Sequence, residues 1–428
     1  MKKFYVLALS ALMVAAFAVP SFAKVNLSGA IWATYWAQQQ GEVAYQMGNG
    51  IDVNTTVNAI AMGGTRGTAP KTFLVGQNMT GNGIQGKATA GDGFIIALDC
   101  PVNDWVKAYG EYDVLNAGGI NLQQGYINLA FMKEFNVRAG LMQVPFGLEP
   151  TQQPTVGNEE VFVSAYTQQA NGLLQRQYDV GVQALGTVAS GMVDYNVFVG
   201  NGALNTVHDN ACTAPAVPTV VSTVSDVTPD NNDAKQVGVN LCFKPFTGAF
   251  VGGGYFAGDY ALAAGSTDNG QAIQQAKFTA YDVNAGYEYG NIFSVSAEYA
   301  TSRFDRLSNA YNVGTQQWGT DRTAQRVNEY ILKAIYTGVA DWESGVRYGV
   351  VDPKNLEAEM AAGFSAERKT SFAVGYKFAR AAFLKAEYSI LNTNFNYTNN
   401  MLAATGVRQN PTKDVADNIA ALSLGLQF

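Results

Sequence analysis

The chain ends Ala420-Ala421-Leu422-Ser423-Leu424-Gly425-Leu426-Gln427-Phe428, and this stretch decides the fold class. Large apolar residues fall on every second position, while the residues between them are small or polar. Successive side chains of a strand point to opposite faces, so this alternation predicts a β-strand with one apolar face and one wet face. Each further segment that shows the same period adds a strand to the same kind of sheet.

Four more segments alternate in this way: 105–114, 193–200, 341–350 and 382–390. Short turns are expected at 101–104, 133–136, 189–191, 244–248, 289–291, 337–340 and 379–381. Polar connections alternate with these turns at 39–84, 115–119, 146–175, 202–235, 262–275, 305–325, 351–367 and 396–415. This order predicts sixteen strands of roughly 9–12 residues with both chain ends on the short-turn side, the layout of bacterial outer-membrane barrels.

Composition supports a membrane barrel over a soluble sheet. Charged residues make up 14% of the chain, whereas soluble domains average about 25%. After residue 23 the chain contains no apolar stretch long enough for a membrane helix. Hydrocarbon offers no hydrogen-bond partners to a sheet edge, so a spanning sheet must close on itself. We therefore expect an all-β fold, a closed antiparallel barrel over residues 24–428.

The first 23 residues are expected to be a secretory signal peptide. Lys2 and Lys3 precede the apolar run 4–19, and Ser21-Phe22-Ala23 supplies the small residues that a signal peptidase requires. The run is short for a spanning anchor. The mature protein is thus expected to begin at Lys24.

Net charge argues against nucleic acid as a partner. Without Lys2 and Lys3, the formal charge changes from −7 to about −9, whereas phosphate binding requires a basic surface. The stretch Gly81–Lys87 resembles a phosphate-binding loop, but Ala88 stands where the magnesium-binding hydroxyl is needed, and no strand–helix pattern surrounds it. A glycine-rich external loop is the better interpretation.

The sequence gives little support for catalysis or for a bound cofactor. His208 is the only histidine and lies in a Thr- and Val-rich loop, where a catalytic base beside a positioned nucleophile is improbable. Cys100, Cys212 and Cys242 are dispersed along the chain, and the predicted strand order keeps them too far apart for disulfides. We expect no enzyme activity, no catalytic residue, no metal, no cofactor and three free thiols.

The terminal Leu424–Phe428 stretch is similar to the signal that barrel-assembly machinery recognises in outer-membrane proteins. Residues 137–147, which end in Pro145-Phe146-Gly147, look like the strand that leads into the third loop of phosphate-selective and related porins. Val25–Gly29 resembles the opening of porins from sulfate- and metal-reducing bacteria. The chain therefore resembles the sixteen-stranded trimeric porins of Gram-negative bacteria. This resemblance implies a homotrimer in the outer membrane, exported through the periplasm, with a third loop (146–175) that folds inward and narrows the pore.

Every second residue of a strand points into the barrel, and the positions that do so are called the inward parity. They predict the residues that line the pore. The wall residues expected there are Lys107, Glu111, Asp113, Arg138, Glu343, Arg347, Lys385 and Glu387. The third loop adds Glu149, Glu159 and Glu160 and carries no basic residue between Pro145 and Arg176. Charged side chains in a dry core would be prohibitive without partners, whereas in a water-filled lumen they set ion selectivity.

These features together predict a porin for passive diffusion of small polar solutes and ions, with a weak preference for cations. The expected partners are outer-membrane lipid and lipopolysaccharide, the barrel-assembly machinery and two further copies of the chain. The alternatives are a structural barrel that sheathes or accompanies a periplasmic electron-transfer protein, and an adhesin that binds through its loops.

Removing Phe428 should lower insertion into the outer membrane while export continues, because Phe428 ends the outward Leu422–Leu424–Leu426 stripe. Phe428→Tyr is the control, since it keeps an aromatic ring at the last position. Fractionation and surface labelling would measure insertion. Normal surface levels of the truncated chain would refute the assembly role.

Overall fold

The wall of the molecule consists of sixteen long antiparallel strands. The computed structural model describes residues 25–39, 72–74, 93–114, 120–148, 161–163, 178–201, 235–260, 267–268, 271–272, 276–304, 311–312, 317–318, 325–354, 364–379, 381–396 and 412–427. The wall strands are β1 (Asn26–Gln39), β3 (Gly93–Pro101), β4 (Val106–Val114), β5 (Ile120–Met132), β6 (Phe135–Gln143), β7 (Tyr178–Val188), β8 (Val193–Gly200), β9 (Gln236–Phe243), β10 (Ala249–Tyr260), β13 (Ala276–Tyr289), β14 (Phe293–Phe304), β17 (Gln325–Val339), β18 (Trp342–Lys354), β19 (Phe364–Ala379), β20 (Ala382–Asn396) and β21 (Thr412–Gln427).

Shorter elements lie in the connections. Strand β2 (Thr72–Leu74) pairs with β1, and a single 3₁₀ turn, η2 (Ala189–Gly191), joins β7 to β8. The pairs β11 (Thr267–Asp268) with β12 (Gln271–Ala272) and β15 (Tyr311–Asn312) with β16 (Gln317–Trp318) form two small separate sheets. The described part of the chain contains no helix that is both long and apolar enough to cross a membrane.

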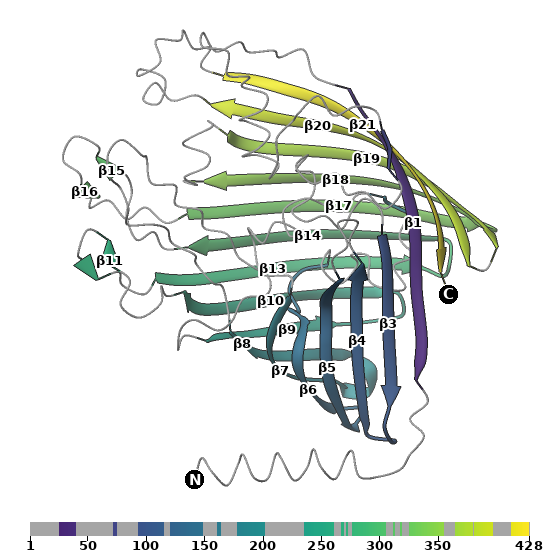
Figure 1. The fold of residues 1–428 in the computed structure, drawn as a ribbon, viewed down its shortest axis with the longest axis vertical. Helices are drawn as coiled ribbons and strands as arrows, with labels where there is room; N and C mark the ends of the chain where they lie inside the picture. The colour runs from purple at the N-terminus through teal and green to yellow at the C-terminus, as the bar shows by residue number, and fades with distance from the viewer. Residues whose placement is uncertain are drawn as a thin grey trace.

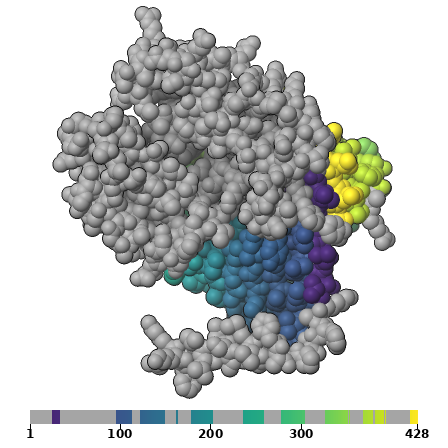
Figure 2. All heavy atoms as spheres, viewed as in Figure 1, coloured from purple at the N-terminus to yellow at the C-terminus, as the bar shows by residue number. Residues whose placement is uncertain are grey.

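The first and last strands close the sheet. One edge of β1 pairs with β21 from Ala30↔Gln427 to Gln39↔Asn418, and its other edge pairs with β3 from Asn26↔Asp99 to Trp32↔Gly93. Figures 1 and 2 show purple β1 directly beside the yellow C-terminal strands. The predicted closed barrel of sixteen antiparallel strands is therefore confirmed.

The two faces of the wall differ in chemistry, as the alternation predicted. On β21, Leu422, Leu424 and Leu426 are 46–53% exposed, whereas Ala421 and Ser423 between them are buried. Exposed large apolar residues recur on the outward parity of every wall strand from β5 to β10 and from β13 to β21. Buried acids, amides and lysines occupy the opposite parity. Apolar side chains outside and polar side chains inside are the arrangement of a transmembrane barrel.

Strand bounds depart from the predicted ones at two places. The first loop was expected to end at 84, but β3 begins only at Gly93, and β2 lies between β1 and β3. Strand lengths range from 8 residues in β8 to 16 in β19 and β21, against the predicted 9–12. Apolar and polar residues alternate only in the part of a strand that contacts lipid. The pattern therefore does not reveal polar extensions of a strand, such as the start of β21.

Gly140 allows β6 to pack closely against β5. Its φ of +138° is unfavourable for other residues, and a Cβ there would lie 2.3 Å from the Gly125 carbonyl oxygen. The segment Val144–Gly147 that turns into the barrel follows directly after this strand.

Both described cysteines are free, and Cys212 lies outside the described residues. Cys100 is opposite Ala108 on the outward parity, while Cys242 is opposite Asp194 on the inward parity. In a Cys212→Ser background in liposomes, a charged thiosulfonate should therefore label Cys242, and only an apolar maleimide should label Cys100. Mass spectrometry of the labelled peptides measures this. The reverse pattern would mean that the face assignment of β3 and β9 is wrong.

Candidate functional site: the inner wall and the third loop

The structure places the described wall residues of the predicted pore on the inward parity. Glu111, Glu343, Arg347, Lys385 and Glu387 are buried, Arg138 is half-buried, and Lys107 is exposed near the turn end. Asp113 lies in β4, but its side chain is not among the described ones. Glu149, Glu159, Glu160 and Phe428 lie outside the described residues.

The third loop, the chain between β6 and β7, is described at 144–148 and 161–163, and both parts contact the inner wall. In the first part, the Gly147 N–H donates to Asp282 Oδ1 at 3.2 Å, and the Leu148 N–H donates to Glu298 Oε2 at 2.9 Å. Asn284 Nδ2 donates to the other oxygen of Asp282 at 2.8 Å. Two wall carboxylates thus satisfy backbone donors that would otherwise be buried without partners.

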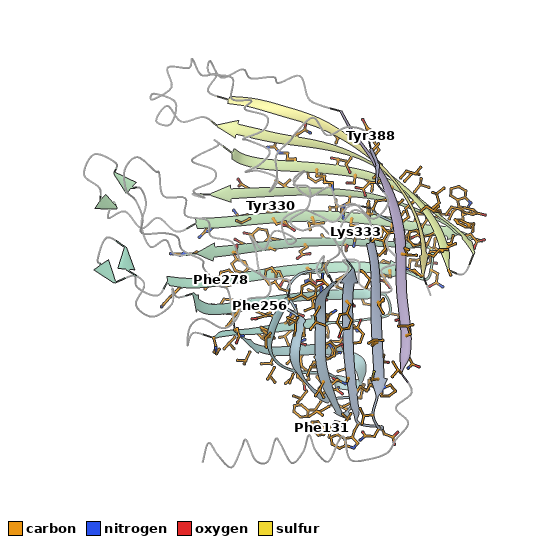
Figure 3. The ribbon with its side chains drawn as sticks, in the orientation of Figure 1. Phe131, Phe256, Phe278, Tyr330, Lys333 and Tyr388 are labelled. Atoms are coloured by element: carbon orange, nitrogen blue, oxygen red, sulfur yellow. The ribbon has the colours of Figure 1, made fainter. Side chains whose placement is uncertain are left out.

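An apolar patch on the inner wall holds the same part of the loop. Phe146 is 1% exposed and meets the ring of Phe256 edge-on, with the ring centroids 5.7 Å apart. The patch consists of Met142, Val144, Phe146, Phe198, Phe256, Phe278, Ala280, Ala300, Val327 and Ile331. Figure 3 shows Phe256 and Phe278 on the neighbouring strands β10 and β13. Burial of several aromatic rings is a large contribution, about 1.5–3 kcal/mol for each fully buried side chain.

The second part of the loop lies in a slot on the next arc of the inner wall, formed by β17 to β20. Val161 and Phe162 are buried against Ala373 and Ile335. Gly345 leaves room for them, since a Cβ there would be 2.8 Å from Val161 Cγ1 and 2.9 Å from Phe162 Cζ. The Arg347 guanidinium carbon lies 4.5 Å from the centre of the Phe162 ring. A cation over an aromatic face attracts it by roughly 0.5–2 kcal/mol.

Glu387 contacts both the loop residues in this slot and two basic residues of the wall, Arg347 and Lys369. Its Oε2 accepts the Val163 N–H at 2.8 Å, and its Oε1 accepts the Ser389 hydroxyl at 2.7 Å. Arg347 Nη2 and Lys369 Nζ lie 3.8 and 3.9 Å from the same Oε1. One carboxylate therefore faces two buried cations and holds the backbone of the loop.

Ion pairs also occur nearer the turn end. Lys377 Nζ lies 3.3 Å from Glu343 Oε1, and Lys244 pairs with Asp194. The hydrogen bond from Lys244 to the Asp194 carboxylate raises the pKa of this lysine above its ordinary value. These pairs cancel much of the wall charge locally, so the described wall carries no long ladder of one sign.

Sequence reasoning missed Asp282 and Glu298, which hold the first part of the loop. It also missed Glu329 and Lys369, and all four residues are buried on the inward parity. Their segments do alternate, as in Phe278, Ala280, Asp282 and Asn284, so parity could have identified them as inward. Nothing in the sequence indicates which of them contact the third loop, because those contacts join residues more than 130 positions apart.

Solved structures share this fold over nearly the whole chain. The outer-membrane channel DcaP of Acinetobacter baumannii is 12% identical, with 96% of this chain and 99% of that chain covered and a TM-score of 0.59. The anion-selective porin of Comamonas acidovorans is 13% identical, with 95% and 100% covered and a TM-score of 0.54. The trimer form of OmpT, an outer-membrane protein of Vibrio cholerae, is 12% identical, with 95% and 100% covered and a TM-score of 0.52.

The molecule is thus a barrel of the outer-membrane porin type. No protein-family model and no curated protein matches the sequence. At these identities the shared property is the fold, which together with the apolar outer face places the chain in the outer membrane. Among the described residues, no group of three or more His, Cys, Asp or Glu side chains could hold a metal ion.

Glu387→Gln should loosen the second part of the third loop. The amide still accepts the Val163 N–H, but it loses the charge that attracts Arg347 and Lys369, on the order of 1–2 kcal/mol. Endoproteinase Glu-C can cut after Glu149, Glu159 and Glu160, so its cleavage rate in the folded barrel should rise on the order of tenfold. Glu343→Gln is the control, because it removes an inner-wall charge with no described bond to the loop backbone. Equal cleavage of both variants would contradict the anchoring role.

Proposed function

We propose that this protein is a porin, a non-enzymatic water-filled channel through which small hydrophilic solutes and ions diffuse passively. The observation that supports this best is the contrast between the two faces of a closed sixteen-stranded wall. Its outward residues are apolar, and its inward residues include acids, amides, lysines and arginines. Barrels of sixteen strands are wide enough to leave an aqueous path, whereas eight-stranded ones are filled by side chains.

The third loop is proposed to set the width of this channel. Its two described parts contact neighbouring arcs of the wall, β10 to β14 at 146–148 and β17 to β20 at 161–163. Strands β7, β8 and β9 separate β6 from β10, so a loop that leaves β6 and contacts both arcs extends into the interior. Contacts of the loop with both arcs also disfavour a sheath function, because a sheath must leave its interior to a partner protein.

Export and assembly of this porin would follow the route expected from the sequence. Residues 1–23 would be removed on export, and residues 24–428 would fold with the barrel-assembly machinery as a homotrimer. The trimeric state is supported by the solved OmpT structure described as a trimer form. Solutes and ions are the proposed ligands, with no enzyme reaction.

The channel is also proposed to have a weak preference for cations. The wall offers little net charge, because Arg347 and Lys369 face Glu387, Lys377 pairs with Glu343, and Lys244 pairs with Asp194. The third loop adds Glu149, Glu159 and Glu160, and the last two directly precede the anchored Val161. Acidic side chains at a constriction favour cations. Screening over about 8 Å at physiological salt keeps the preference small.

Reversal potential in a potassium chloride gradient tests this assignment. The purified parent should prefer cations weakly, and more strongly as salt falls. Glu159→Gln with Glu160→Gln should shift the potential toward anions without changing the strand structure. Glu134→Gln with Asp341→Asn removes two acids from the turns and should leave the potential unchanged. No conductance from the folded parent would refute the channel, and an unshifted potential in the first double variant would refute the role of the loop.

A further inference from the structure

Two tyrosines of the wall, Tyr109 and Tyr126, lie on the inward parity. They are directly opposite each other on β4 and β5, which are neighbours in Figure 1, and they share the parity of the buried Glu111. All other wall tyrosines whose side chains are described lie on the outward parity, as the exposed Tyr255 and Tyr281 do. Aromatic residues on that outer face form the girdles of a membrane barrel. The inward pair belongs to no girdle and needs a different explanation.

Contacts with the wall hold both inward rings in place. The ring centres of Tyr109 and Tyr126 are 5.2 Å apart, with the planes tilted by 30°. The Tyr109 hydroxyl donates to Glu111 Oε2 at 2.6 Å. Tyr126 packs against the apolar patch of the inner wall, and the Arg138 guanidinium carbon lies 5.2 Å from its ring centre. The two half-buried rings therefore form a firm aromatic platform on the inner wall.

Polar groups with unused hydrogen-bonding capacity border this platform. Lys107, Asn128 and Arg138 form one direct row across β4, β5 and β6 on its turn side. The Arg138 Nε donates to Asn128 Oδ1 at 3.4 Å. Among the residues that the structure describes, the Arg138 Nη groups, the Asn128 amide nitrogen and the Lys107 ammonium have no hydrogen-bond partner. On the loop side, Gln124 lies opposite Glu111, and its amide has no such partner in the described chain either.

The charges around the platform cancel. The described charged side chains on the inward parity of β3 to β6 are two cations, Lys107 and Arg138, and two acids, Asp99 and Glu111. Asp99 is directly opposite Tyr109. A site with equal numbers of both charges gives little net attraction to an ion of either sign. It does offer both donors and acceptors to a solute that carries hydroxyl groups, because a hydroxyl can donate and accept.

We propose that Tyr109 and Tyr126 form a binding platform for neutral sugars in the pyranose form. This inference rests on the proposed channel function and names one class of its solutes. A pyranose ring presents C–H groups on its faces, and their weak positive charge suits the negative faces of aromatic rings. The sugar hydroxyls accept hydrogen bonds from Arg138 and Asn128 and donate to Asp99.

Weak binding is sufficient for such a platform. A solute in a channel must be held well enough to enter and loosely enough to leave. The platform fits this requirement because it lies on one stretch of the wall, over β4 to β6, and contacts a sugar from one side. It is separate from the arcs of β10 to β14 and β17 to β20 that hold the third loop.

The test uses the full mature protein, purified in a detergent without a sugar headgroup. Titration followed by saturation-transfer NMR measures binding of glucose and of sorbitol, its open-chain alcohol. The parent should bind glucose saturably and sorbitol on the order of tenfold more weakly, because sorbitol has the hydroxyls without the ring. Glucuronate and glucosamine keep the ring and add a negative or a positive charge. Neither should bind more tightly than glucose.

Three variants locate the site. Tyr109→Leu with Tyr126→Leu removes both rings and should weaken glucose binding on the order of tenfold. Tyr109→Phe with Tyr126→Phe keeps the rings and should weaken it less. Arg138→Met leaves both tyrosines in place and removes donors to the hydroxyls, so it should also weaken glucose binding and tests the site independently of the leucine variant.

A matched control is available on the outer face. The rings of Tyr281 and Tyr299 are also in contact, with centres 6.1 Å apart, but they lie on the outward parity. Tyr281→Leu with Tyr299→Leu should therefore bind glucose as the parent does. Heat-modified migration on gels shows which variants are folded.

Three results would overturn the platform. The first is equal binding of glucose and sorbitol by the parent. The second is glucose binding at the parent level in the folded leucine variant, or in Arg138→Met if the leucine variant does not fold. The third is glucuronate or glucosamine binding on the order of tenfold more tightly than glucose, which would make the ligand an ion. A parent that conducts ions without saturable glucose binding overturns this platform alone, whereas a parent without conductance overturns the channel itself.

Discussion

The structure depends on the hydrogen bonds between β1 and β21. A sheet in hydrocarbon cannot leave an edge of N–H and C=O groups unpaired, because each would cost several kcal/mol. The first and last wall strands are joined over most of β1, although they are nearly 400 residues apart in the chain. Every other strand pairs with its sequence neighbours through short turns or loops, so this one long-range pairing converts a meander into a wall without edges.

The fold was largely predictable from the sequence, because a closed barrel uses one repeated local rule. Leu422, Leu424 and Leu426 show which face of β21 contacts lipid, and the same rule gave Glu387 and Arg347 their inward positions. The glycine-rich stretch before Gly93 carries no such alternation, so the start of β3 was placed too early. Polar strand extensions were missed for the same reason.

The candidate site was less predictable because its contacts are not periodic. The sequence places Phe198, Phe256 and Phe278 on the inward parity, where polar side chains are expected. Their partner is Phe146, which lies beyond the end of β6, where alternation has stopped. Likewise, parity identifies Glu387 as an inward acid but not as the acceptor of the Val163 N–H. Asp282, Glu298 and Glu387 therefore hold the backbone of the loop, and a count of lumen charges from the sequence overstates the number that face solute.

Strand β2 has a consequence for how freely the first loop can change. β1 runs to Gln39, but β3 pairs with it only as far as Trp32, so one edge of β1 continues beyond its neighbour. Thr72–Leu74 pairs with Thr34–Trp36 and covers part of that edge. An uncovered edge there would be a template for strands of other copies. The first loop can therefore gain or lose residues on either side of β2, provided that Thr72–Leu74 still pairs with the edge of β1. This loop then has a structural function in covering the edge, in addition to connecting β1 with β3.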